Sequence, residues 1–228
     1  MAVEPIELMA GLSRWSAPMR RFSTGVCAVA FATVVAVLMT PGVAPAEPPG
    51  IPSAAAARAL LAALTVADET TMSGYSRNKF PHWIIVSGDC DTRERVLQRD
   101  GTGVRVDAKC HPTAGSWYSP YDGKTVRDVS GVDIDHVVPL AEAWRSGARE
   151  WSTAQREKFA NDLDNPQLIA VTASSNRSKG DQDPASWLPP NASYRCTYTR
   201  MWVAVKSTWR LTLQHTEKTA LGKALQSC

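Results

Sequence analysis

The residues whose types and spacing could support catalysis are concentrated between positions 131 and 183. An apolar, β-branched run there favours a strand that carries a carboxylate next to an imidazole. After a long excursion, a polar turn, a second apolar strand and a short polar helix carry two carboxamides, an arginine and a lysine. In chain order the candidates are Asp135, His136, Asn165, Asn176, Arg177 and Lys179.

Together these side chains supply what hydrolysis of a phosphodiester bond needs. Mg²⁺ prefers oxygen ligands and keeps several waters, so Asp135 and the amide oxygen of Asn176 can hold it if a substrate phosphate completes the shell. His136 is then free to accept a proton from water, because an unperturbed pKa of about 6.5 suits a general base. Lys179 and Arg177 add positive charge near the phosphate.

At these residues the chain resembles the HNH, or ββα-metal, endonucleases. Within them it is similar to secreted bacterial proteins related to the C-terminal nuclease domain of the modification-dependent restriction system. The resemblance rests on the sequence DHVVPL from Asp135, on the pair Asp164-Asn165, and on NRSKGD from Asn176. It extends more loosely from Cys90 to Cys228.

The resemblance implies a role for each candidate. His136 would be the general base, and Asp135 and Asn176 would ligate Mg²⁺ or Mn²⁺. Asn165 would orient the histidine and its loop, and Lys179 would face a phosphate. Asn176 stands where the name-giving pattern has its final histidine, and this oxygen ligand favours Mg²⁺ or Mn²⁺ over Zn²⁺.

The implied fold is α+β, with a ββα-metal (HNH/His-Me finger) core at 131–183. Further helices, short strands and disulfides would surround that core. Residues 103–121 alternate in hydrophobicity between turn residues and predict short strands of an adjoining sheet. We therefore interpret residues 61–228 as one nuclease domain and residues 47–60 as a linker, although the Ala/Leu run over 54–64 favours a helix.

The first 46 residues have the pattern of a secretory signal. Two arginines precede an apolar run over 26–39, and a small-residue cleavage site ends at Ala46. The polar lead before Met19 is long for such a signal, which is consistent with a mis-assigned start and an N-terminal extension. A transmembrane anchor is the alternative, but the run is shorter than the ~20 residues that span a bilayer. We expect a secreted protein without a stable membrane anchor.

The cysteines agree with export. Of five in the chain, Cys27 lies within the signal, which leaves an even number that permits three pairings. No pair has CxxC spacing, so an extracellular disulfide framework is favoured over a zinc site. The sequential pairing is favoured among the three. The four cysteines are Cys90, Cys110, Cys196 and Cys228.

The remaining patterns leave one choice open. Residues 194–213 repeat apolar and aromatic residues at intervals of three and four, which predicts an amphipathic core helix. The segment around Arg93, Arg95 and Arg99 predicts a helix whose arginines are either solvated or bind a nucleic-acid backbone.

Composition limits the possible functions. The chain has 228 residues, is 44% hydrophobic and 21% charged, and carries a net charge of +3. These values indicate a globular protein and exclude a polybasic binder, so nucleic acid would have to bind in a local groove. We expect a monomer; whether an immunity or inhibitor protein exists is left open by the sequence.

Two functions are consistent with the sequence. The first is a secreted, metal-dependent endonuclease that acts on nucleic acid, DNA more than RNA, with low sequence specificity. The second is an exported envelope protein that keeps the fold and binds a partner without cutting it. The full candidate set favours the endonuclease.

Overall fold

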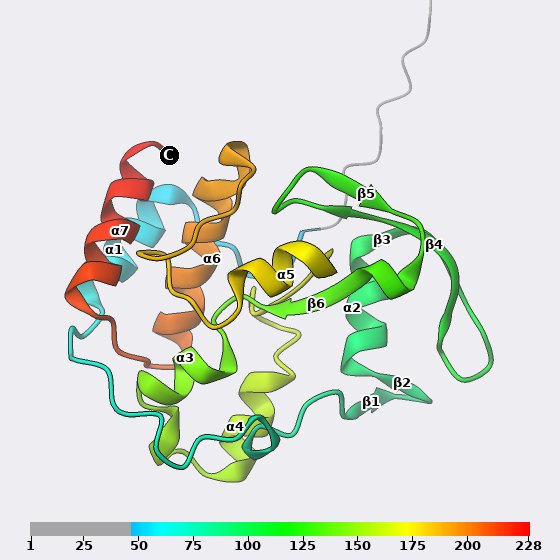
Figure 1. Cartoon of the computed structure of the whole chain (residues 1–228), viewed down its shortest axis with the longest axis horizontal. Helices are drawn as coiled ribbons and strands as arrows, with labels where there is room; N and C mark the ends of the chain where they lie inside the picture. The colour runs from blue at the N-terminus through cyan, green and yellow to red at the C-terminus, as the bar shows by residue number, and fades with distance from the viewer. Residues whose placement is uncertain (1–46) are drawn as a thin grey trace, which may run out of the picture. The chain divides into compact units, whose positions relative to one another are not determined.

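The computed structural model describes residues 47–228, and the predicted signal with its extension lies outside the described residues. The described chain is a mixed α+β fold with small antiparallel sheets (Figure 1). This confirms the expected class, while the ββα-metal assignment stays a prediction. The elements are α1 (Ala54–Ala63), η1 (Arg77–Lys79), β1 (Ile85–Ser87), β2 (Cys90–Asp91), α2 (Thr92–Asp100), β3 (Gly101–Val106), β4 (Pro112–Ser119), β5 (Lys124–Val126), η2 (Val129–Gly131), β6 (Val132–His136), α3 (Leu140–Arg145), η3 (Ala148–Glu150), α4 (Thr153–Ala160), β7 (Leu168–Thr172), α5 (Ala173–Lys179), η4 (Ala192–Tyr194), α6 (Arg195–Thr208) and α7 (His215–Gln226).

Helix α1 belongs to the folded domain. Ser53 caps its first turn by accepting a hydrogen bond from the backbone of Ala56, and the alanine-rich sequence favours the helix that follows. Ala57 is fully buried, and α1 lies beside α6 and α7 (Figure 1). The sequence suggested a linker over 47–60, but residues 54–60 form most of this helix.

The antiparallel pair β6–β7 organises the centre of the domain. Its register places Val132 opposite Thr172 and His136 opposite Leu168. Val132 and Ile134 pack with Val96 of α2 in one apolar cluster. Because side chains alternate along a strand, the two aspartates of β6 point to the other face, where α5 lies. The pair is thus covered by a helix on each face.

Helix α2 is fixed to both ends of this pair. A capping box between Asp91 and Glu94 starts the helix. Arg93 donates to the carbonyl of Val132 at 3.1 Å and Arg99 to that of Leu168 at 2.6 Å. These two arginines therefore satisfy backbone carbonyls of the β6–β7 pair, and among the three in the segment Arg95 is the exposed one.

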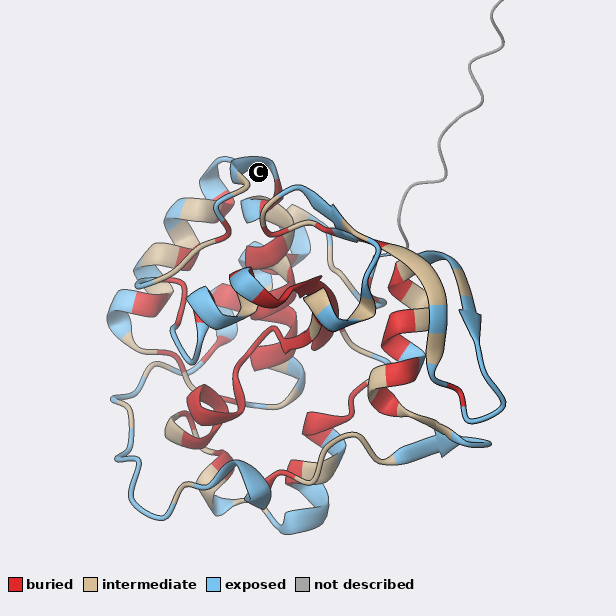
Figure 2. Cartoon of the chain, turned by 45° about the vertical axis from the view of Figure 1, so that its right-hand side comes forward, coloured by how far each residue is buried: buried red, intermediate tan, exposed pale blue. Residues whose placement is uncertain are grey.

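The helical part of the domain contains a buried charge network next to an aromatic core. The stripe on α6 is buried as expected, with Tyr198 and Trp202 fully inaccessible. Lys206 lies 2.7 Å from Glu142 of α3 and 3.2 Å from Glu217 of α7, and all three are fully buried. Burial raises the pKa of Glu217 to about 7. Buried residues also continue from β6 into α3 (Figure 2).

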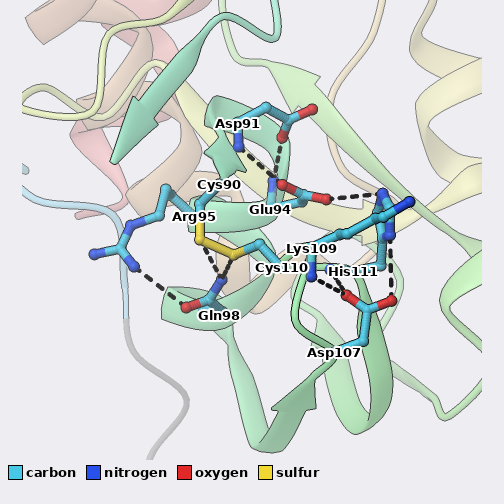
Figure 3. Close-up of a disulfide and its surroundings, with 9 residues drawn as sticks. All are labelled: Cys90, Asp91, Glu94, Arg95, Gln98, Asp107, Lys109, Cys110 and His111. Atoms are coloured by element: carbon cyan, nitrogen blue, oxygen red, sulfur yellow. Dashed lines mark hydrogen bonds and ion pairs between the residues drawn. A yellow bond between two sulfur atoms is a disulfide. The ribbon is translucent and has the colours of Figure 1, made fainter. Parts of the chain in front are cut away.

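The described residues contain two disulfides. Their pairing is the sequential one that the sequence favoured. Cys90 bonds Cys110, and Cys196 bonds Cys228. The first joins β2 to the turn before β4, and the amide of Gln98 on α2 donates to the Cys110 sulfur at 3.0 Å (Figure 3). In the chain-entropy model, each crosslink stabilises the fold by about 3 kcal/mol.

Candidate functional site

Asp135 and Lys179 form a buried ion pair between β6 and α5. Lys179 Nζ lies 2.8 Å from Asp135 Oδ1 and also donates to the carbonyl of His136 at 2.9 Å. The other carboxylate oxygen accepts from the Tyr121 hydroxyl at 2.7 Å. Burial raises the pKa of the Asp135 carboxyl, and the Lys179 ammonium opposes that shift. Both carboxylate oxygens are therefore engaged by other side chains.

A second contact lies one helical turn earlier on the same face. Asn176 Nδ2 donates to Asp133 Oδ2 at 3.0 Å, and both side chains are partly exposed. Asp133 and Asp135 are two residues apart on the strand, and Asn176 and Lys179 are three residues apart on the helix. These spacings place each pair on one face of its element. We call these four residues the β6–α5 face.

The donor types on this face fit a hard divalent cation. Asp133, Asp135 and Asn176 carry oxygens that Mg²⁺ or Mn²⁺ prefers, and turning the Asn176 amide would present its oxygen to Asp133. No three His, Cys, Asp or Glu residues within the described range could hold a metal as a group. A cation here would thus depend on the amide and on ligands from water or substrate. The position that a cation would take beside Asp135 is filled by the Lys179 ammonium.

His136 lies on the opposite face of β6. Its Nε2 atom is 2.9 Å from the carbonyl oxygen of Ala160. Because a carbonyl only accepts, Nε2 carries the hydrogen and Nδ1 keeps the lone pair. Burial lowers the pKa of His136 to about 3, although the bond to Ala160 opposes this shift. The ring is therefore neutral at physiological pH, with one defined acceptor atom.

An indole covers the His136 ring. The Trp83 ring is stacked on it, with centroids 5.4 Å apart and planes 27° apart. Trp83 has a φ of 60°, in the left-handed region that a bulky residue rarely adopts. His82 lies beside both rings, and its Nε2 atom accepts from Arg77 at 3.4 Å. Trp83 thus contributes to the burial that keeps the histidine neutral.

Asn165 does not make the contact with His136 that the resemblance implies. Its amide nitrogen donates to both oxygens of Asp162, at 3.2 and 3.0 Å. The group that holds the imidazole is the Ala160 carbonyl, which lies at the start of the same loop. Asn165 therefore fixes the loop, and a backbone atom orients the ring.

Asn161 is a positioning residue that the sequence interpretation missed. Its amide donates to the carbonyls of Pro81 and Glu157, both at 2.8 Å. Its oxygen accepts from the Ile84 backbone at 3.3 Å and from the Thr92 hydroxyl at 2.8 Å. These bonds connect the segment that carries Trp83 to the residue next to Ala160. The only signal in the sequence was a polar side chain at the end of a mostly polar helical segment.

The two predicted phosphate contacts differ in accessibility. Arg177 is exposed on α5. Lys179 is fully buried and directed at Asp135, so it does not face a phosphate in this structure. Lys179 was expected to face a phosphate, but it lies two residues after Arg177 on another face of the helix, where the buried Asp135 carboxylate requires its charge. The structure thus brings Lys179 to Asp135 and Asn176 to Asp133, and places His136 on the other face.

Comparison with known proteins connects this chain to restriction enzymes. Residues 98–224 match the family described as GmrSD restriction endonucleases, C-terminal domain. The chain is also 58% identical over 200 residues to an "Uncharacterized secreted protein" of Arthroderma benhamiae, covering 88% of this chain and 98% of that protein. This relative is fungal, so the expected bacterial affiliation is not confirmed. No solved structure matches. In the described residues no helix is long and apolar enough to cross a membrane.

Proposed function

The chain belongs to the family of the GmrSD restriction endonuclease C-terminal domain, and on that premise we propose that it is a secreted, metal-dependent endonuclease. It hydrolyses phosphodiester bonds of nucleic acid, DNA in preference to RNA, with low sequence specificity. Secretion is supported by the two disulfides and by the secreted relative.

The state of His136 is the observation that carries this proposal. Its Nε2 atom is bonded to Ala160, so the unprotonated Nδ1 atom can accept a proton from water. The low pKa keeps this atom unprotonated at physiological pH, and the negative charge of a bound phosphate nearby would raise that pKa and make the ring a stronger base. Once the ring gains a proton, the Ala160 carbonyl holds the resulting imidazolium in place. Asn161 and Asn165 keep the loop with that carbonyl at a fixed position.

The β6–α5 face is the proposed cation site. Asp135 and Asn176 would hold Mg²⁺ or Mn²⁺, with Asp133 beside them. A cation held there would supply positive charge to offset the negative charge of the phosphate oxygens. Each Asp135 oxygen accepts one side-chain hydrogen bond and keeps a second lone pair that could ligate a cation, but the Lys179 ammonium would have to move away from the cation's charge. Arg177, exposed on the same helix, adds charge for the nucleic-acid backbone.

Plasmid cleavage by the purified protein tests the proposal. The protein should cut DNA with Mg²⁺ and not with EDTA. His136→Ala should lower the rate by about 10² to 10⁴, the usual effect of removing a general base. His215→Ala is the matched control, because His215 is exposed on α7. Equal rates for the two variants would refute His136 as the base.

A binding protein without cleavage is the second candidate. It is favoured by the engaged Asp135 carboxylate and by the burial of His136 under Trp83. That function predicts that the protein binds nucleic acid or another polymer equally well with Mg²⁺ or EDTA and leaves it intact. The plasmid assay and a binding measurement on the same sample separate the two functions.

A further inference from the structure

A hollow of about 520 Å³ lies directly next to the loop that holds His136. Ile84 and Val86 line one side of it, at the start of the β1–β2 hairpin. The loop that follows α4 also lines it, and this loop begins one residue after the Ala160 carbonyl. Lys158 and Trp209 complete the lining. The full lining is Ile84, Val86, Lys158, Asn161, Asp162, Leu163, Asp164, Asn165 and Trp209.

The walls of this hollow are rigidly connected to the His136 site. Asn161 bonds the backbone of Ile84 at 3.3 Å and the carbonyl of Pro81 at 2.8 Å. Trp209 Nε1 donates to Asp162 Oδ2 at 2.8 Å, which fixes the indole against the loop. A ligand in the hollow would therefore lie at a defined position relative to the imidazole.

The lining combines apolar, charged and hydrogen-bonding groups, which suits a nucleotide. The half-buried Trp209 and the side chains of Ile84 and Val86 give an apolar, partly aromatic surface. The exposed Lys158 gives one positive charge for a backbone phosphate at one side of the hollow, while the carboxylates of Asp162 and Asp164 lie in the loop on another side. Asp164 and the Oδ1 atom of Asn165 are acceptors, since the Asn165 nitrogen is already bonded to Asp162. These acceptors match a base with an exocyclic amino group.

We propose that this hollow is a subsite for one unpaired nucleotide of the nucleic-acid chain, next to the bond that His136 helps to cut. The base lies against Trp209 and Val86, and its phosphate contacts Lys158. In an unpaired nucleotide, adenine, cytosine and guanine each offer an amino group with two donor hydrogens to these acceptors, whereas thymine offers a single N3–H between two carbonyl acceptors. The subsite therefore prefers amino-bearing bases. This subsite rests on the proposed function, because it specifies which nucleotides the proposed nuclease site prefers.

Binding of short, fluorescently labelled oligo(dC) and oligo(dT) to the purified protein in EDTA tests the subsite without cleavage. The unchanged protein should bind oligo(dC) more tightly. Val86→Trp should fill the hollow, weaken oligo(dC) binding about tenfold and remove the preference, because one stacked base contributes ~1–3 kcal/mol. Val106→Trp, exposed on β3, is its control.

A second variant tests the phosphate contact. Lys158→Ala should weaken the binding of both oligonucleotides equally. It should also reduce the slope of log K, the association constant, against log salt concentration by about 0.7, as expected for one lost contact to single-stranded DNA. Lys223→Ala, exposed on α7, is the control. Lys158→Arg should restore binding.

The outcomes separate the subsite from the nuclease function. Weaker oligonucleotide binding by Val86→Trp and Lys158→Ala than by their control variants supports the subsite, even if the protein does not cleave plasmid DNA. Variants that bind like their controls overturn the subsite, even if the protein cleaves. Failure of the unchanged protein to bind either oligonucleotide also overturns it. Plasmid cleavage, measured on the same preparation, decides the nuclease function independently.

Discussion

Replacing His136 with glutamine tests the burial of the imidazole through protein stability. The ring is buried, its Nε2 atom is bonded to Ala160, and burial lowers its pKa to about 3. A glutamine amide can also donate a hydrogen bond to the Ala160 carbonyl, but it does not titrate. The difference between the protein and His136→Gln therefore isolates the pH dependence due to this one ring.

The sign of the effect follows from the direction of the shift. Above a pH of about 6.5 the ring is neutral in both the unfolded and the folded chain. Below that value the unfolded chain gains a proton that the folded chain does not, so stability is lost as the pH falls toward 3. The loss is ~1.4 kcal/mol per pH unit, which amounts to about 2 kcal/mol at pH 5.

Urea unfolding of both proteins at several pH values between 5 and 8 measures this difference. The advantage of the unchanged protein over His136→Gln should shrink by about 2 kcal/mol from pH 7 to pH 5. All other titrating groups are shared by the two proteins and cancel. A constant difference would show that the ring titrates normally, and the argument for a buried, neutral base would fail.

Three further substitutions have defined outcomes. Asp135→Ala should lower the free energy of unfolding in urea by about 3–5 kcal/mol, because it leaves the fully buried Lys179 without its counter-charge; an unchanged midpoint would contradict the ion pair. Asn176→Ala should abolish Mg²⁺-dependent cleavage with little change in melting temperature, since the residue is partly exposed; retained cleavage would remove it from the cation site. Trp83→Ala should uncover His136 and raise its pKa toward about 6.5, so that the cleavage rate falls about tenfold from pH 7.5 to 5.5; a flat pH profile would show that Trp83 does not keep the ring buried.

Local patterns were sufficient for much of the fold. The helices of 54–64 and 194–213, the two strands of the candidate site and the short helix after them follow from propensity and periodicity, which act between near neighbours. Even the opposite directions of Asp135 and His136 follow from the alternation of a strand. The sequential disulfides agree with cysteine spacing, although spacing alone permitted three pairings.

The sequence by itself therefore determined which residue types are available for chemistry and which elements carry them. Only the tertiary structure decided their partners. Lys179 turns inward because a buried carboxylate needs a counter-charge, and the Ala160 carbonyl holds His136 because the loop after α4 passes beside the strand end. Trp83 and Asn161 reach the site from segments far apart in the chain, and such contacts leave no local pattern in a sequence.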